Sequence, residues 1–440
     1  MKLSTRSPRW LALAAVLVVG PVAGCSAGSL GSSEEESGGG TTITWLTGVD
    51  ETAQATAEAI VAAFEDANPD ITVKLDGKPA GGEGDNLVKT RLQTGTMPDV
   101  FDYNSGSLFQ QIAPANNLAP LDDSVVGAVD DTFFPQVSVD STVYGVPYGT
   151  AFGGGVMYNK KVFDQLGLTV PTTWAEFMSN SEVIKAAGIA PVIQTYQDTW
   201  TSQLFVLGDF HNVAAVQPTW AEDYTANQAE YATDPVAMAG FQHLQDVHDA
   251  GYENADYAST KLEDGMRQLA AGTGAMYPML SANITTLQSV APEAVADIGF
   301  FALPGDDAAS NGLTAWFPNA VYIAKTTEGE ALEASKKLLA FIASPEGCEA
   351  FGSASDPTGP YLVEGCELPA DVPPVTKDVQ TYFDEDKQSP ALEFLSPVKG
   401  PNLEQITVEI GSGIRSAADG AALYDEDVEK QAQQLGLEGW

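Results

Sequence analysis

Basic residues are scarce in this 440-residue chain, which has 20 Lys and Arg against 60 Asp and Glu. The formal net charge is −40, and it becomes −43 once a leader that holds Lys2, Arg6 and Arg9 and no acidic residue is removed. Phosphate backbones and anionic lipid headgroups attract proteins through Lys and Arg, so this balance argues against both. We therefore predict no nucleic-acid partner and interpret the acidity as a source of solubility.

Motifs for common catalytic and cofactor sites are missing as well. His243 and His248 are five positions apart, so they do not share a helical face as the ligands of an H-E-x-x-H zinc site do, and His211 stands alone. The one Gly-x-Ser-x-Gly motif, at residues 24–28, lies at the leader junction and not in a strand-turn-helix. We predict a protein without catalytic residues, cofactor or metal, in which the histidines are surface or packed side chains.

Long apolar runs are absent beyond the N-terminal leader. Its run, Trp10 to Val19, is shorter than the roughly 20 residues of a spanning helix and follows a basic segment, as in an export signal. The run is followed by Val22-Ala23-Gly24-Cys25, which resembles a bacterial lipobox with Val in place of the commoner Leu. We predict a signal peptide at 1–24, lipidation of Cys25 and residence on the extracellular face of the cell membrane. Ordinary secretion with an unmodified cysteine is the alternative.

Cysteine is also rare, with Cys348 and Cys366 remaining if Cys25 carries lipid. An exported protein meets oxidising conditions, so these two residues are predicted to form a disulfide, and two free buried thiols are the alternative. Residues 25–40, rich in Ser, Gly and Glu, have nothing to bury and are predicted to be a flexible tether.

The folded part begins with strand and helix patterns in alternation. Residues 42–47 are β-rich, Asp50 is a helix N-cap before the helical face of Ala57, Ile60 and Phe64, and residues 71–75 alternate as a strand. Thr173 and Ser344 mark two later helix starts. Further strand-like segments occur at 191–195, 274–279, 298–303 and 319–324, which favours an α/β fold. The glycines between 149 and 155 suit a chain that crosses between two bodies.

Several short motifs, taken together and in order, resemble one family. They are Ile43-Thr-Trp45, Asn68-Pro-Asp-Ile71, Met97-Pro-Asp-Val100, Gly145-Val-Pro-Tyr148, Tyr158-Asn-Lys160, Pro171-Thr-Thr-Trp174, Leu303-Pro-Gly305 and Ser344-Pro-Glu-Gly347. This series resembles the family 1 extracellular solute-binding proteins, the carbohydrate-binding lipoproteins of ABC importers related to maltose-binding protein. The tail after Cys366 carries little of the pattern.

The resemblance implies a two-lobe, type II periplasmic-binding-protein-like fold with hinge strands and a central cleft. It implies a monomer that closes around a sugar or oligosaccharide and presents it to the permease subunits of an ABC importer. From the family pattern, lobe 1 is expected at 41–147 and 304–354, and lobe 2 at 148–303 and 355–440.

Sugars offer hydroxyls to carboxylates and amides, and C–H faces to aromatic rings. Together with the family pattern, this gives the candidate ligand-binding residues Asp50, Asp102, Tyr103, Asn104, Tyr148, Phe152, Asp198, Trp200, Tyr277, Asn283 and Trp316. Asp102 is the foremost polar candidate, and Trp200 is assigned to the ligand rather than to the core. Trp316 is expected to form the aromatic wall of lobe 1.

Several of these assignments have structural alternatives. Asp50 and Asn283 could serve only as helix caps, and Tyr148 and Phe152 could pack the hinge. Trp45, Trp174 and Phe64 are assigned to the core. At the level of function, the alternatives are a receptor for another solute such as a polyamine and a surface-anchored glycan-cleaving enzyme. With 60 carboxylates in the chain, a catalytic pair is neither identified nor excluded by sequence.

Overall fold

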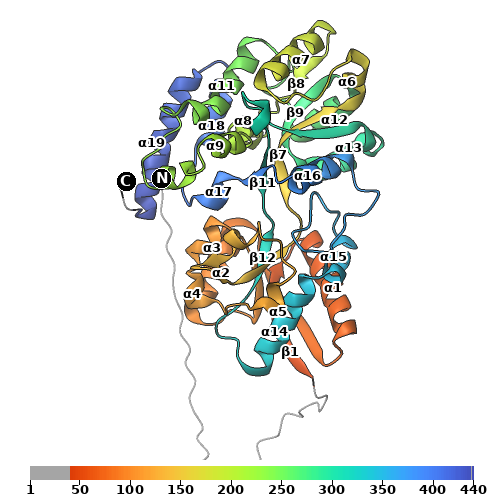
Figure 1. Cartoon of the computed structure of the whole chain (residues 1–440), viewed down its shortest axis with the longest axis vertical. Coiled ribbons are helices and arrows are strands. Elements are labelled where there is room, and N and C mark those ends of the chain that lie inside the picture. Colours follow the sequence, from red (N-terminus) through yellow and green to blue (C-terminus); the bar gives the residue numbers. More distant parts are fainter. Residues whose placement is uncertain (1–39, 438) are drawn as a thin grey trace, which may run out of the picture. The chain divides into compact units, whose positions relative to one another are not determined.

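The structure is a computed structural model that describes residues 40–437 and 439–440 (Figure 1). The predicted signal peptide, Cys25 and nearly all of the predicted tether lie outside the described residues. Within the described residues, two main β-sheets are each surrounded by helices. A small hairpin of β4 (Ser138–Val139) and β5 (Thr142–Val143) accompanies them.

The first main sheet has five strands in the order β2-β1-β3-β12-β6. Strands β1 and β2 run parallel with α1 between them, so the predicted β-α-β opening is confirmed. Strand β12 returns from much later in the chain and pairs antiparallel with both β3 and β6. The strands are β1 (Thr41–Gly48), β2 (Ile71–Lys78), β3 (Val100–Tyr103), β6 (Gly145–Tyr148) and β12 (Asn319–Ile323).

The second main sheet has six strands, five of them in the order β13-β11-β7-β9-β8, while β10 pairs with β7. Its central strand β7 pairs antiparallel with β9, β10 and β11. The strands are β7 (Phe152–Asn159), β8 (Ala190–Val192), β9 (Gly274–Leu280), β10 (Ile298–Ala302), β11 (Leu313–Trp316) and β13 (Gln388–Pro390). Strands β11 and β13 were not predicted, because each is short and has no clear alternation of polar and apolar residues.

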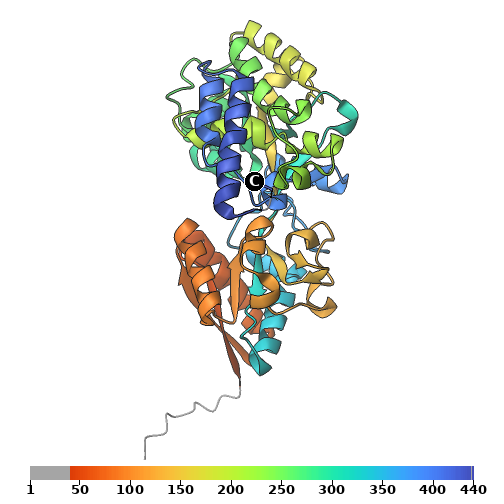
Figure 2. The same cartoon turned by 90° about the vertical axis from the view of Figure 1, so that its left-hand side faces the viewer.

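Helices surround both sheets. Those near the first sheet are α1 (Glu51–Ala67), α2 (Gly81–Thr94), α3 (Ser107–Gln111), α4 (Pro114–Asn117), α5 (Asp123–Val126), α14 (Gly329–Ile342) and α15 (Pro345–Gly352). Those near the second sheet are α6 (Lys160–Leu166), α7 (Trp174–Ala186), α8 (Leu204–Leu207), α9 (Phe210–Val216), α10 (Trp220–Thr225), α11 (Pro235–Asp249), α12 (Leu262–Ala271), α13 (Ile284–Val290), α16 (Pro374–Asp384), α17 (Leu392–Leu395), α18 (Leu403–Gly411) and α19 (Ala417–Leu435). Helix α19 packs on α11 and α18 (Figures 1 and 2).

Local capping sets the helix starts that the sequence predicts. Asp50 accepts a hydrogen bond from the Ala53 N–H at 2.9 Å and begins α1. Thr173 and Glu176 form the predicted capping box of α7, and Ser344 caps α15 with Pro345 in its first turn. Each cap satisfies an N–H group that has no partner within the helix, which typically stabilises the fold by about 1 kcal/mol.

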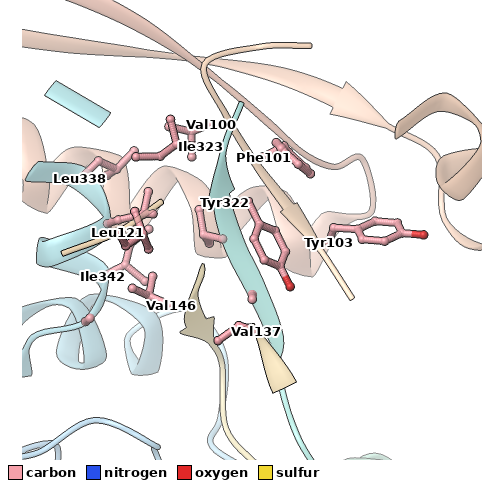
Figure 3. Packing of buried hydrophobic residues seen from close by; sticks show 14 of the residues in the cluster. Val100, Phe101, Tyr103, Leu121, Val137, Val146, Tyr322, Ile323, Leu338 and Ile342 are labelled. Carbon is pink, nitrogen blue, oxygen red and sulfur yellow. The ribbon is translucent and has the colours of Figure 1, made fainter. Parts of the chain in front are cut away.

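Separate hydrophobic cores form around the two sheets. The first includes Trp45 and Phe64, both with no exposed surface, and Figure 3 shows Val100, Ile323 and Leu338 of β3, β12 and α14 meeting within it. The second sheet is packed by two further clusters, and Trp174 belongs to one of them. The predicted core positions of these aromatic residues are therefore confirmed. With one core for each sheet, the described chain has the two-lobe α/β architecture that was predicted.

Within residues 40–437, the chain passes from one sheet to the other at three places. The first passage joins β6 to β7, and the second joins β11 to β12, between Trp316 and Asn319. The third lies between Val363 in the first core and Val375 in a core of the second sheet. Because β11 pairs with β7, we propose that lobe 2 extends to Trp316 instead of ending at residue 303, and that residues 355–363 belong to lobe 1.

Three consecutive glycines in β7 permit close packing. A Cβ atom on Gly154 would lie 2.4 Å from the Trp316 ring, and one on Gly153 would lie 2.7 Å from Leu313. Gly149, with φ of +112°, lies in the passage between β6 and β7. The expectation that these glycines serve the crossing therefore applies to Gly149, whereas those in β7 make room for neighbouring side chains.

Cys348 and Cys366 form a disulfide in the structure. The bond joins α15 to the segment that follows Val363, near the third passage. No helix among the described residues combines the length and apolar character needed to cross a bilayer.

Replacing Cys366 by Ala should lower the free energy of unfolding by about 3 kcal/mol, because the 18-residue separation closes a loop that restricts the unfolded chain. Denaturant titration of the oxidised protein and of the variant measures this difference. The wild type in dithiothreitol should match the variant, and the variant itself should not respond to dithiothreitol. Equal stability of oxidised and reduced wild type would contradict the prediction.

Candidate functional site

Two neighbouring cavities lie where the chain passes between the sheets. The larger, of about 820 Å³, is called the cleft cavity and takes residues from α1, α13, the end of β6 and the segment after α15. The smaller, of about 480 Å³, is called the side cavity and takes residues from α3, α17 and the ends of β11 and β12. Phe152 and Pro318 line both. Both lobes thus contribute to both cavities.

An aromatic pair lies beside the two cavities, with Phe152 lining both and Trp316 lining only the side cavity. The Phe152 and Trp316 rings are stacked, with centroids 6.1 Å apart and planes 12° from parallel. The Trp316 indole N–H donates to Glu393 Oε1 at 2.6 Å, which fixes the ring, and Gly154 leaves the space that it fills. Phe152 is only half-buried, so part of its ring is free to contact a ligand. A flat apolar surface of this kind suits the C–H face of a ring-shaped solute.

The cleft cavity is otherwise rich in neutral polar side chains. Seven Ser and Thr residues and one Gln line it, namely Thr52, Thr150, Thr285, Ser289, Ser353, Ser355, Thr358 and Gln288. Asp356 is the single carboxylate among its described lining residues, and the Gln288 side-chain amide donates to it at 3.5 Å. Hydroxyls and amides both donate and accept hydrogen bonds, so this lining matches a neutral solute with many hydroxyl groups.

A buried charge pair lies close to this cavity. Asp102, 5% exposed, accepts a hydrogen bond from Lys78 Nζ at 2.6 Å through one carboxylate oxygen. Its other oxygen, Oδ1, has no protein partner among the described residues, and neither has the hydroxyl of Tyr148. Burial and the nearby Asp102 carboxylate raise the pKa of Tyr148, so this side chain stays a neutral phenol.

The structure brings four of the predicted residues to the cavities. Tyr148 and Phe152 line the cleft cavity, and Asn104, Phe152 and Trp316 line the side cavity. Trp316 reaches the site from β11, which pairs with β7 of the second sheet, whereas it was predicted in the wall of lobe 1. The physical reason is the pairing of β11 with β7, which the sequence pattern did not reveal.

Other predicted residues lie near the cavities without lining them. Asp50 is exposed and caps α1, and Asp102 is held by Lys78. Tyr103 is 2% exposed, and burial raises the pKa of its hydroxyl. Asn283 precedes α13 without a side-chain capping bond, while its neighbours Ala282 and Thr285 line the cleft cavity.

The remaining predicted residues have structural roles in lobe 2. Asp198 Oδ2 accepts a hydrogen bond from the Leu262 N–H at 2.7 Å, at the start of α12. Trp200 packs against the core cluster that contains Tyr277. Tyr277 has no exposed surface, and its hydroxyl is 2.6 Å from that of Thr195. A fully buried ring cannot contact a solute without being displaced, so Tyr277 is left out of the site proposed below.

Sequence reasoning missed several residues of the site. Lys78 ends β2, and its sequence signal was only a Gly-Lys pair without a P-loop. Gln288 and Thr285 come from α13, and Phe351 and Asp356 come from the end of α15 and the loop beyond it. These residues are ordinary helix and loop residues in sequence, and only the positions of α13, of α15 and of the loop after α15 bring them to the cavity. No group of metal-ligating side chains suited to a metal ion occurs in residues 40–437 or 439–440.

The comparisons agree with this architecture. The sequence profile of the bacterial extracellular solute-binding protein family matches residues 48–347. The chain therefore belongs to this family.

Relatives in the family include sugar-binding and transporter proteins. The chain is 27% identical over 269 residues to the multiple sugar-binding protein of Streptococcus mutans, covering 59% of this chain and 61% of that protein. It is 24% identical over 230 residues to an ABC transporter extracellular-binding protein of Pyrococcus horikoshii, covering 50% of each. The chain thus spans between half and about three fifths of the length of these relatives.

Solved structures show the same fold. RafE from Streptococcus pneumoniae superposes with a TM-score of 0.74 at 21% identity, covering 90% of this chain and 98% of RafE. The binding protein MsmE from Bacillus subtilis gives 0.73 at 16% identity, covering 90% and 99%. At these identities the likeness shows the two-lobe fold of solute-binding proteins.

Replacing Phe152 by Ala should weaken solute binding at least tenfold, because the exposed side of the stacked pair is lost, while Trp316 stays bonded to Glu393. Isothermal titration with the solute identified by screening measures the loss. Trp200→Ala is the matched control, since Trp200 lines neither cavity and packs against the core; it should lower the melting temperature and leave affinity within twofold. The opposite pattern, with affinity lost in Trp200→Ala only, would restore Trp200 to the site.

Proposed function

We propose that this protein is the lipid-anchored substrate-binding component of an ABC importer and binds a sugar or oligosaccharide at the cleft cavity. The observation that carries the proposal is the Phe152 ring, stacked on Trp316, beside a wall of hydroxyl and amide side chains. The Phe152 ring would contact the apolar face of the sugar, and Gln288, the Ser and Thr side chains and Asp356 would bind its hydroxyls. The multiple sugar-binding protein of S. mutans, a relative, supports the same class of ligand.

Binding of this kind is coupled to movement of the lobes. Because the cleft cavity is lined from both lobes, a bound solute gains its full set of contacts only when both are in place. Its differential affinity would then favour the arrangement that a permease recognises. The passages between the sheets, including the one with Gly149, are where the backbone would bend.

The alternative functions fit the cleft cavity less well. A polyamine needs carboxylates directed at its ammonium groups, but Asp356 is the single acid among the described lining residues, and Asp102 is paired with Lys78. A glycan-cleaving enzyme needs two carboxylates across the scissile bond, about 5 to 9.5 Å apart. The described lining residues of the cleft cavity provide one carboxylate, that of Asp356. The lining therefore supports a binding site for a neutral solute.

The anchor belongs to the proposal as well. A diacylglycerol group on Cys25 would hold the mature protein at the outer face of the membrane, because two acyl chains anchor stably where one does not. A tether at 25–40 would let the folded lobes reach a permease.

A panel of mono- and oligosaccharides and of polyamines, tested by melting shift and followed by titration calorimetry, should give saturable binding to a sugar. Gln288→Leu should then weaken that binding about two- to tenfold, which corresponds to the loss of one hydrogen bond to a neutral group. Gln268→Leu, at a half-buried glutamine that lines neither cavity, should bind normally. Binding of polyamines alone at this site, or release of cleaved product, would sink the proposal.

Cys25→Ser should move the protein from the membrane fraction to the culture fluid of the producing bacterium, since the acylated residue is lost. Fractionation with immunoblotting measures the distribution. Sugar affinity of the released protein should equal that of the wild type. Retention of the variant in the membrane fraction would show that the anchor is elsewhere.

A further inference from the structure

A third cavity, of about 580 Å³, lies entirely within lobe 2 and is separate from the proposed sugar site. It is called the lobe-2 cavity and is bounded by the start of α7, by Asp209 before α9, by α11 and by the loop after β10. Its volume falls in the range of small-molecule sites. None of the residues that line it also lines the cleft cavity or the side cavity.

Two buried polar atoms on its wall have no hydrogen-bond partner among the described residues. Asp209 is 1% exposed; one carboxylate oxygen accepts from the Asn212 amide at 2.8 Å, and the other, Oδ2, has no hydrogen-bond partner among the described residues. His243 is 4% exposed, and its Nδ1 also lacks a partner there. Buried polar atoms left in this state typically cost about 1 to 3 kcal/mol each, so a partner supplied from the cavity would be favourable.

The wall around these groups is acidic and partly apolar. Asp246, Asp306 and Asp307 line the cavity together with Asp209, and its described lining residues include no Lys or Arg. Apolar surface comes from Trp174, Val216, Pro235, Val236, Met238 and Ala239. A ligand that suits this wall carries positive charge at one end and an apolar body at the other.

Stacking and hydrogen bonds hold the side chains of this wall in place. The Trp174 and His243 rings are stacked with centroids 3.7 Å apart, and the Trp174 indole N–H donates to Asp246 Oδ2 at 3.2 Å. Asn212 holds Asp209 and also donates to the Leu303 carbonyl at 3.0 Å. Gly240 lets α11 approach, because a Cβ there would lie 2.8 Å from the Phe205 carbonyl.

We propose that the lobe-2 cavity binds a small organic ammonium ion, with the ammonium group on Asp209 Oδ2 and His243 Nδ1 and the apolar body against Trp174 and Met238. An ammonium group has three N–H donors and needs acceptors, which a carboxylate and a neutral imidazole provide. A divalent metal ion requires a fuller shell of oxygen ligands, and the described residues hold no such group. The proposal does not depend on sugar binding at the cleft cavity.

The protonation states of the two groups agree with this assignment. Burial lowers the pKa of His243 to about 3, so the imidazole is neutral and does not repel a cation. Burial raises the pKa of Asp209 to about 8, with Asp306 adding to the effect and the Asn212 hydrogen bond opposing it. A bound cation would place a positive charge beside Asp209 and so stabilise the ionised form of its carboxylate. Because unliganded Asp209 is largely a neutral acid at pH 7, asparagine is a close structural substitute.

The test is titration calorimetry of the full-length mature protein with benzylamine and 1,5-diaminopentane as probes, and with benzyl alcohol and CaCl₂ as controls. The wild type should bind at least one amine saturably, with affinity at least tenfold above that for benzyl alcohol and with no response to calcium. Asp209→Asn should reduce the amine affinity at least tenfold while its melting temperature without ligand stays near that of the wild type. Ala239→Phe, which fills the cavity but keeps the carboxylates, should also abolish binding.

Control variants separate this site from others. Asp427→Asn, at a buried carboxylate that bonds to Asn402 and lies outside the cavity, should retain amine binding. Phe152→Ala should retain it too, whatever that variant does to sugar binding. Equal binding of benzyl alcohol, a calcium response without an amine response, unchanged affinity in Asp209→Asn, or no binding of either amine would each overturn the proposal.

Discussion

The close packing of β11 on β7 is the constraint on which the proposed sugar site depends. Gly153 and Gly154 have no side chains, so Leu313 and the Trp316 ring occupy the space beside β7. Trp316 is thereby brought into a stack with Phe152, at the place where the chain leaves the second sheet for the first. A larger residue at 154 would displace the indole, and the surface shared by the cleft and side cavities would lose its shape.

The cavities of this protein differ in charge, and that difference suggests different ligands. Around the cleft, hydroxyl and amide groups predominate, and the charge of Asp102 is balanced by Lys78. Within lobe 2, four Asp side chains line one cavity with no Lys or Arg among the described lining residues. The acidic side chains of the chain are thus not distributed evenly between its cavities. A neutral solute and a cation would therefore bind at separate sites.

Much of the fold was predictable because its signals are local. The caps at Asp50, Thr173 and Ser344 act on N–H groups three residues away. Strands β10 and β12 lie within the predicted ranges, and β9 extends one residue beyond its range. The site was less predictable. Phe152 and Tyr148 were found from the family pattern, whereas Gln288 was not, and Tyr277 proved to face the core.

By itself, the sequence determined the fold class, the helix starts, the acidity and the family, since these follow from composition and from residues close together in the chain. Tertiary structure decided that β11 joins the second sheet, that Lys78 meets Asp102 across 24 positions, and that Asp209 and His243 share a cavity wall. Those outcomes depend on strand pairing and helix packing between distant segments. Such contacts form only when the whole chain is packed, and no local pattern encodes them.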